Sequence, residues 1–131
     1  MPPKQNQKVL IVDDDKFLLN MYSVKFQKFG FEVDTATSGQ DALTKLREGN
    51  TPDVMLLDVV MPSMDGIEFL ENVRKEKLAS NAVVIILSNQ NQSADIERAK
   101  NLGIASYIVK ASSIPSEVVA EVIRVMGVAG K

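Results

Sequence analysis

The chain has 131 residues, of which 45% are hydrophobic and 24% charged, and its net charge is −2. This composition is typical of one globular domain, and without a basic stripe nucleic acid is a poor candidate as a direct partner. Cysteine and histidine are absent, which excludes disulfides, thiolate or imidazole metal ligands and a histidine base. We expect residues 1–7 to form a flexible tail without a signal peptide. Residues 8–128 should form one cytoplasmic domain that does not interact with a membrane.

Five short apolar segments alternate along the chain with five segments of helical periodicity. The predicted strands are residues 9–12, 31–36, 52–57, 82–87 and 104–109. The fourth is the most apolar, which indicates an interior place in the sheet. The predicted helices cover residues 16–29, 38–48, 93–102 and 113–126, and a third helix in chain order begins at Asp65 and carries Ile67, Leu70 and Val73. Five successive strand–helix units predict an α/β fold, a doubly wound five-stranded parallel sheet with helices on both faces.

Local signals mark the helix ends. Asp15 has the position and chemistry of an N-cap for the first helix, and Ser38 has them for the second. Asp65 and Glu68 have the spacing of a capping box at the start of the third helix. Within the first helix, one apolar face is predicted to be buried, comprising Leu18, Tyr22, Phe26 and Phe29.

Charged and polar residues follow the apolar strands directly. Asp13, Asp14 and Asp15 follow the first strand, Asp58 the third, Ser88 the fourth and Lys110 the fifth. Function in open α/β sheets collects at the carboxyl ends of the strands. A carboxylate such as Asp58, placed after four apolar residues, is costly to bury unless a cation compensates it. This arrangement therefore predicts a charged site at one edge of the sheet.

Four segments together resemble the receiver domain of two-component response regulators, of the chemotaxis, flavodoxin-like type. They are VLIVDD at 9–14, LLDVVMPSMDG at 56–66, IILS at 85–88 and SYIVK at 106–110. Their order and spacing also match, and the resemblance extends over essentially the whole chain. It implies the strand order 2-1-3-4-5 and a receiver domain over residues 8–128.

The resemblance also implies a chemistry and a set of roles. Asp58 is expected to accept a phosphoryl group from a histidine kinase or a histidine phosphotransfer protein. Mg²⁺, or Mn²⁺ in its place, is expected to bind Asp14 directly, Asp13 mainly through water, Asp58, and the backbone carbonyl of Val60. Lys110 should pair with Asp58 and then with the phosphoryl oxygens. The domain is expected to be a phosphoacceptor that catalyses only its own phosphorylation and dephosphorylation.

A switch is implied as well. Ser88 is expected to form a hydrogen bond with a phosphoryl oxygen and to draw its own loop inward. Tyr107 is expected to occupy the space that this movement opens. The change should reach a surface on the fourth helix, fifth strand and fifth helix, which would bind a downstream protein or a second copy of the chain. The resemblance also implies that Val60 and Gln90 occupy positions that influence loss of the phosphoryl group. Because Val60 offers no side-chain hydrogen bond to water, we expect this loss to be slow.

The sequence departs from the family after Lys110, where Ala111 replaces the usual proline. A cis bond before alanine costs about 2.5–4 kcal/mol, so we expect a trans Lys110–Ala111 bond. Two other functions remain alternatives. One is a Mg²⁺-dependent phosphatase of the haloacid dehalogenase kind, although its nucleophile would follow the first strand. The other is a receiver-like scaffold that works without phosphorylation.

Overall fold

A computed structural model describes residues 7–88, 93–110 and 114–126. Within them, strands and helices alternate as predicted. The strands are β1 Lys8–Val12, β2 Glu32–Ala36, β3 Val54–Leu57, β4 Val83–Ser88 and β5 Ser106–Val109. The helices are α1 Lys16–Lys28, α2 Gly39–Arg47, α3 Gly66–Lys75, α4 Ser93–Asn101 and α5 Pro115–Met126. No helix among the described residues has the length and apolar character needed to cross a membrane.

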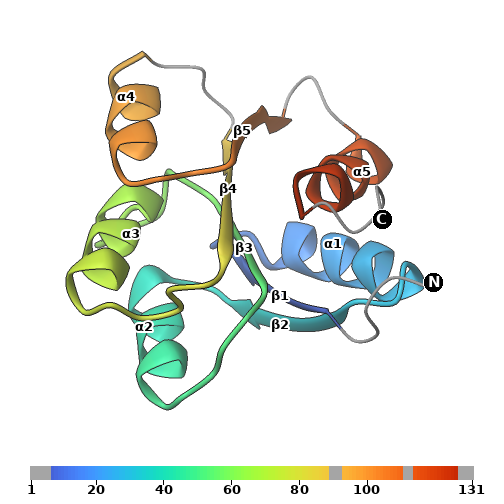
Figure 1. Ribbon diagram of the computed structural model, residues 1–131. Helices are drawn as coiled ribbons and strands as arrows, with labels where there is room; N and C mark the ends of the chain where they lie inside the picture. The colour runs from blue at the N-terminus through green and yellow to red at the C-terminus, as the bar shows by residue number, and fades with distance from the viewer. Residues whose placement is uncertain (1–6, 89–92, 111–113, 127–131) are drawn as a thin grey trace.

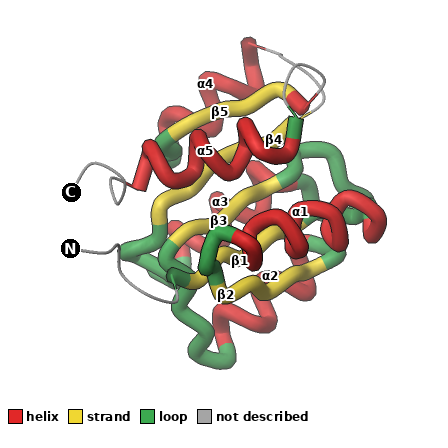
Figure 2. Tube along the Cα trace, turned by 90° about the vertical axis from the view of Figure 1, so that its right-hand side faces the viewer, coloured by secondary structure: helices red, strands yellow, loops and turns green. Residues whose placement is uncertain are grey.

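The five strands form one parallel sheet in the order β2-β1-β3-β4-β5, which confirms the predicted topology. The prediction that the most apolar strand is an interior one is also confirmed, because β4 lies between β3 and β5. Helices α2, α3 and α4 cover one face of the sheet, and α1 and α5 cover the other (Figure 1). In the view turned by 90°, α1 and α5 lie in front of the strands (Figure 2).

Successive strand residues pack on opposite faces, which gives two cores. On the side of α2 and α3, the strands contribute Leu10, Val12, Met55, Leu57, Val84 and Ile86. On the side of α1 and α5, they contribute Val9, Ile11, Val54, Leu56, Ile85 and Leu87. Burial on both faces explains why these strands are nearly continuous apolar runs rather than alternating ones.

The predicted helix caps form. The Asp15 carboxylate accepts hydrogen bonds from the backbone N–H groups of Phe17 and Leu18. The Ser38 hydroxyl accepts one from Asp41. Asp65 and Glu68 form the full reciprocal capping box at the start of α3. These caps fix where α1, α2 and α3 begin, and therefore the shape of the loops at the carboxyl edge of the sheet.

The predicted buried face of α1 is partly wrong. Tyr22 and Phe26 are buried as expected, but Leu19 is buried with them, and Leu18 only partly so. Phe29 is 56% exposed, since α1 ends at Lys28 and the chain turns away. Its place is taken by Phe31, whose ring packs edge-on against Phe26 with centroids 5.2 Å apart.

Candidate functional site

Asp13, Asp58 and Lys110 each follow the last residue of a strand, β1, β3 and β5 respectively. The register pairs Val12 with Leu57, so Asp13 and Asp58 leave neighbouring strands at the same level. The sheet hydrogen bonding continues through them, from Asp58 N–H to the Val12 carbonyl over 2.9 Å and from Asp13 N–H to the Ala36 carbonyl over 3.1 Å. The backbone of the sheet therefore holds both acids firmly.

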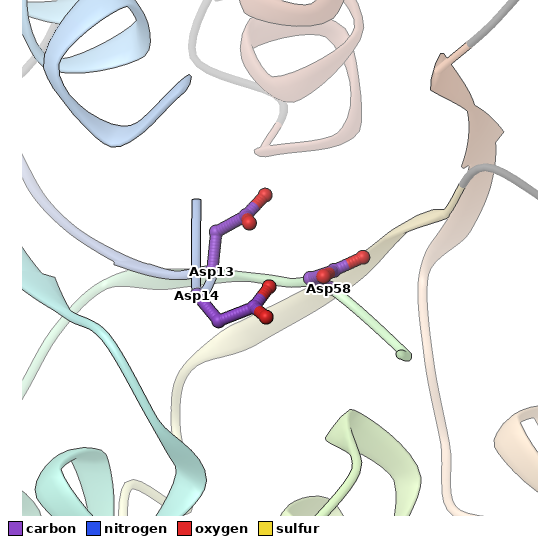
Figure 3. A group of neighbouring side chains, drawn as sticks. All are labelled: Asp13, Asp14 and Asp58. Carbon is purple, nitrogen blue, oxygen red and sulfur yellow. The ribbon is translucent and has the colours of Figure 1, made fainter. Parts of the chain in front are cut away.

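The three acids predicted to form a cluster do so. Asp13, Asp14 and Asp58 each contribute a carboxylate oxygen to a group whose members lie within 4.8 Å of one another (Figure 3). Asp13 is 2% and Asp58 6% exposed, whereas Asp14 is exposed to solvent. The cluster thus has a buried floor and one accessible carboxylate.

Lys110 spans β4 to reach this cluster from β5. Its Nζ donates a hydrogen bond to Asp13 Oδ2 at 2.7 Å and lies 3.4 Å from Asp58 Oδ1. The lysine side chain is only 9% exposed. The expected pairing with Asp58 is present, but Asp13 is the nearer partner, so the ammonium bridges both buried carboxylates.

Burial and charge together set the ionisation of the site. Burial is the main cause that raises the pKa of Asp58 to about 6; Asp13 adds to the rise and Lys110 opposes it. Burial alone would lower the pKa of Lys110, but its hydrogen bond to Asp13 and the charges of Asp58 and Asp13 outweigh burial and raise it. Desolvation is the larger effect, as expected for a carboxylate that follows an apolar strand, and the neighbouring Asp13 carboxylate comes second.

A cavity of about 240 Å³ opens over the acids. Its lining comprises Asp13, Asp14, Asp15, Leu18, Asp58, Val60 and Lys110. The Val60 side chain is 59% exposed at the rim, in the loop that follows β3. Carboxylate oxygens are the ligands that Mg²⁺ prefers, so this donor set fits a hard divalent cation with a phosphate beside it.

Ser88 and Tyr107 are not among the described residues that line this cavity. Ser88 is buried at the carboxyl end of β4, where it is in register with Val109, the residue before Lys110. Tyr107 is half-buried and packs with the core on the α2 and α3 side, the face that α4 covers. Gln90 and the Lys110–Ala111 bond lie outside the described residues.

Sequence reasoning overlooked one residue of the site. Gly66 had no predicted role beyond its place in the segment at 56–66, yet its N–H donates to the Val59 carbonyl over 2.9 Å. An added Cβ at Gly66 would lie 2.0 Å from the backbone oxygen of Asp58. The glycine therefore lets α3 approach the Asp58 backbone, and the only signal in the sequence is its place after the Asp65 cap.

Comparison with known proteins gives one consistent result. A family model described as the response regulator receiver domain matches residues 9–122. The chemotaxis protein CheY of Thermotoga maritima is 37% identical over 114 residues, covering 86% of this chain and 92% of that protein. The structure of CheY4 from Vibrio cholerae has a TM-score of 0.83 at 32% identity, covering 92% of this chain and 98% of that one.

A relative of different length is the alkaline phosphatase synthesis transcriptional regulatory protein PhoP of Bacillus subtilis. It is 34% identical over 117 residues, which are 89% of this chain and 47% of PhoP. The chain thus spans about half the length of this relative. Since the family model covers most of the chain and the fold and acidic cluster agree with it, the protein belongs to the response regulator receiver domain family of two-component signalling systems.

Proposed function

We propose that the protein is a Mg²⁺-dependent phosphoacceptor, phosphorylated on Asp58 by a histidine kinase or a histidine phosphotransfer protein. One observation carries the proposal: the Lys110 ammonium reaches both buried acids, Asp13 and Asp58, beneath a cavity that opens on Asp14. Phosphoryl transfer needs positioning and neutralisation of charge more than covalent chemistry, and this arrangement offers both.

Asp58 is the nucleophile of the proposed reaction. A carboxylate oxygen of Asp58 forms a bond to phosphorus while the bond from phosphorus to the donor's histidine nitrogen breaks, and the leaving imidazole takes up a proton. The Lys110 Nζ lies 3.4 Å from Asp58 Oδ1, close enough for the ammonium to pair with the phosphoryl oxygens once they are transferred. Asp58 is 6% exposed, so little of its side chain is open to bulk water.

Asp14, Asp13 and Asp58 are the side chains that would hold Mg²⁺, with the Val60 carbonyl as a backbone ligand. The ion would supply positive charge to the phosphoryl oxygens. Asp14 suits direct ligation because it is exposed at the cavity, whereas Asp13 already accepts hydrogen bonds from Lys110 and from the Asp15 N–H. This difference supports a role for Asp13 through a bound water.

Ser88 and Tyr107 are proposed to carry the signal from the phosphoryl group to the surface of α4, β5 and α5. Ser88 belongs to β4 and Tyr107 to β5, and the two strands are directly paired. A downstream protein or a second copy of the chain is the proposed partner of that surface. The exposed Val60 side chain, with Gln90, is proposed to modulate loss of the phosphoryl group, and Val60 to slow it.

The direct test is incubation with acetyl phosphate, a small phosphodonor. In the presence of MgCl₂ we expect intact-mass spectrometry to show one added phosphoryl group, which hydroxylamine removes because it is an acyl phosphate. With EDTA in place of MgCl₂, the yield should fall at least about tenfold, since the metal neutralises charge in the transition state. A chain that remains unmodified under all conditions would overturn the proposal.

Mg²⁺ should stabilise the protein more at pH 7.5 than at pH 5. Because the folded pKa of Asp58 is about 6, above its ordinary value of 3.8, the folded state holds more protons between these values. Without metal, the contribution of Asp58 to the free energy of unfolding is therefore complete below pH 3.8 and is lost as pH rises through 6. Mg²⁺ binds the deprotonated carboxylates, so protons compete with it at pH 5.

Thermal unfolding at the two pH values, with and without MgCl₂, measures this effect. At ten to a hundred times its Kd, the metal should add roughly 1.4–2.7 kcal/mol at pH 7.5, and clearly less at pH 5. CaCl₂ and NaCl at matched ionic strength separate specific binding from screening. Equal stabilisation by Mg²⁺ at both pH values would contradict the assignment of the site.

A further inference from the structure

Among the described residues, helix α4 packs against the body of the protein mainly near its carboxyl end. Of the described side chains at 94–101, Ala99 is the only buried one. Ile96 and Leu102 are partly buried, and the remaining side chains are largely polar. By contrast, α3 beside it has five buried residues in ten (Figure 1). With so little apolar burial, polar contacts contribute a large share of what fixes α4 in place.

Arg74 of α3 makes the shortest of these polar contacts among the described residues. Its Nε donates to the Leu102 carbonyl over 2.8 Å, and its Nη2 donates to the Gly103 carbonyl over 3.2 Å. Both acceptors lie in the turn that ends α4, where Gly103 has a φ of 86°. A cation is favourable at the carboxyl end of a helix, and here a neighbouring helix supplies it. The guanidinium holds two consecutive carbonyls at once, which fixes direction as well as distance.

The amino-terminal half of α4 has no comparable attachment in the described part of the chain. At 94–97 the single ion pair joins Asp95 to Arg98 of the same helix over 3.9 Å. Arg98 also lies 3.5 Å from Glu71 of α3, but both side chains are exposed, and such a pair contributes little. Among the described residues, the two ends of α4 therefore differ in the polar contacts that they make with α3.

We propose that Arg74 is a positioning residue that fixes the carboxyl end of α4 to α3, so that signalling moves the amino-terminal half of α4 about this end. The inference rests on the proposed function, because it names which part of the output surface moves when Asp58 is modified. The amino-terminal end of α4 is the one that follows β4 and Ser88 in the chain. Because Arg74 holds the carboxyl end, a change at the amino-terminal end rotates α4 about the held end. The whole helix is not displaced.

The anchoring role is tested in the unmodified protein by amide hydrogen exchange measured by NMR. The amides of Leu102 and Gly103 bond to the carbonyls of Ala99 and Lys100 and report on the end of α4. In Arg74→Gln we expect these two amides to exchange about tenfold faster, with α1 and α2 unchanged. Arg74→Lys keeps the positive charge but cannot donate to both carbonyls in the fixed geometry of a guanidinium. In this variant the two amides should therefore be protected better than in Arg74→Gln and less well than in the wild type.

Arg47→Gln is the matched control. It removes the exposed ion pair between Arg47 of α2 and Glu76, and it leaves α4 untouched. Exchange at Leu102 and Gly103 should stay at the wild-type rate in this variant. Unchanged exchange at these amides in Arg74→Gln would overturn the anchor, as would an equal increase throughout the protein, which would indicate general destabilisation.

The pivot is tested with MgCl₂ and beryllium fluoride, which mimics a phosphoryl group on a carboxylate. The amides of residues 97 and 98 bond to the first turn of α4 and report on its amino-terminal half. In the wild type we expect the exchange of these two amides to change at least about fivefold while Leu102 and Gly103 stay constant. In Arg74→Gln the change should extend to both ends. Equal changes at both ends of the wild-type helix would overturn the pivot. If beryllium fluoride changes nothing in the wild type, the proposed function fails, whereas the comparison of the unmodified proteins still decides whether Arg74 anchors α4.

Discussion

Asp58→Asn is expected to reduce labelling by acetyl phosphate at least about a thousandfold, because a carboxamide is not a nucleophile under these conditions. The exchange of one oxygen for an amide nitrogen leaves the side chain almost the same size, so the cavity should keep its shape. The variant should also be more stable than the wild type at pH 7.5 without Mg²⁺. Burial and Asp13 raise the pKa of Asp58, and the substitution removes a charge that is unfavourable there.

Asp15→Asn is the matched control for this experiment. Asp15 also lines the cavity, but its carboxylate caps α1 by accepting from Phe17 and Leu18, and asparagine caps equally well. Labelling of this variant should remain within about twofold of the wild type. If Asp58→Asn were labelled to the wild-type extent with the same sensitivity to hydroxylamine, another acid of the cluster would be the nucleophile.

The positions of the site residues could be predicted because strand ends are easy to locate in a parallel sheet. Apolar runs identify β1, β3 and β5, and the first polar residue after each run identifies Asp13, Asp58 and Lys110. The strand order was not available from periodicity and came from the resemblance. Once the order is known, the register brings the two acids to adjacent strand ends, and a long lysine side chain can span the one strand between.

Side-chain partners could not be predicted in the same way. Lys110 is closer to Asp13 than to Asp58 because both carboxylates compete for one ammonium, and which is nearer depends on tenths of an ångström. The contact of Arg74 with the end of α4 joins residues 28 and 29 positions apart, and a basic residue in the last turn of α3 looks like an ordinary helix terminus. Such contacts follow from tertiary packing, which no local pattern encodes.

Gly66→Ala should lower the free energy of unfolding by about 3–5 kcal/mol, a loss that few single substitutions reach. The added Cβ would lie 2.0 Å from the Asp58 oxygen, 2.9 Å from the Asp58 carbonyl carbon and 3.2 Å from the Val59 Cα. All three are backbone atoms, which cannot turn aside as a flexible side chain can. Relief of the clash must therefore displace α3 or the Asp58 peptide, and either shift weakens the Gly66 N–H bond to Val59.

Gly49→Ala separates this clash from the ordinary effects of replacing glycine. Gly49 has a φ of 104° and nothing within 4 Å of an added Cβ, so its replacement causes only backbone strain, of about 1 kcal/mol. Denaturant unfolding of both variants should show a loss several times larger for Gly66→Ala, with slower labelling of Asp58 in whatever fraction remains folded. Equal losses for the two variants would mean that α3 can move away from Asp58 freely. In that case the contact with Gly66 would not fix the Asp58 backbone, and the position of the Asp58 carboxylate would not depend on α3.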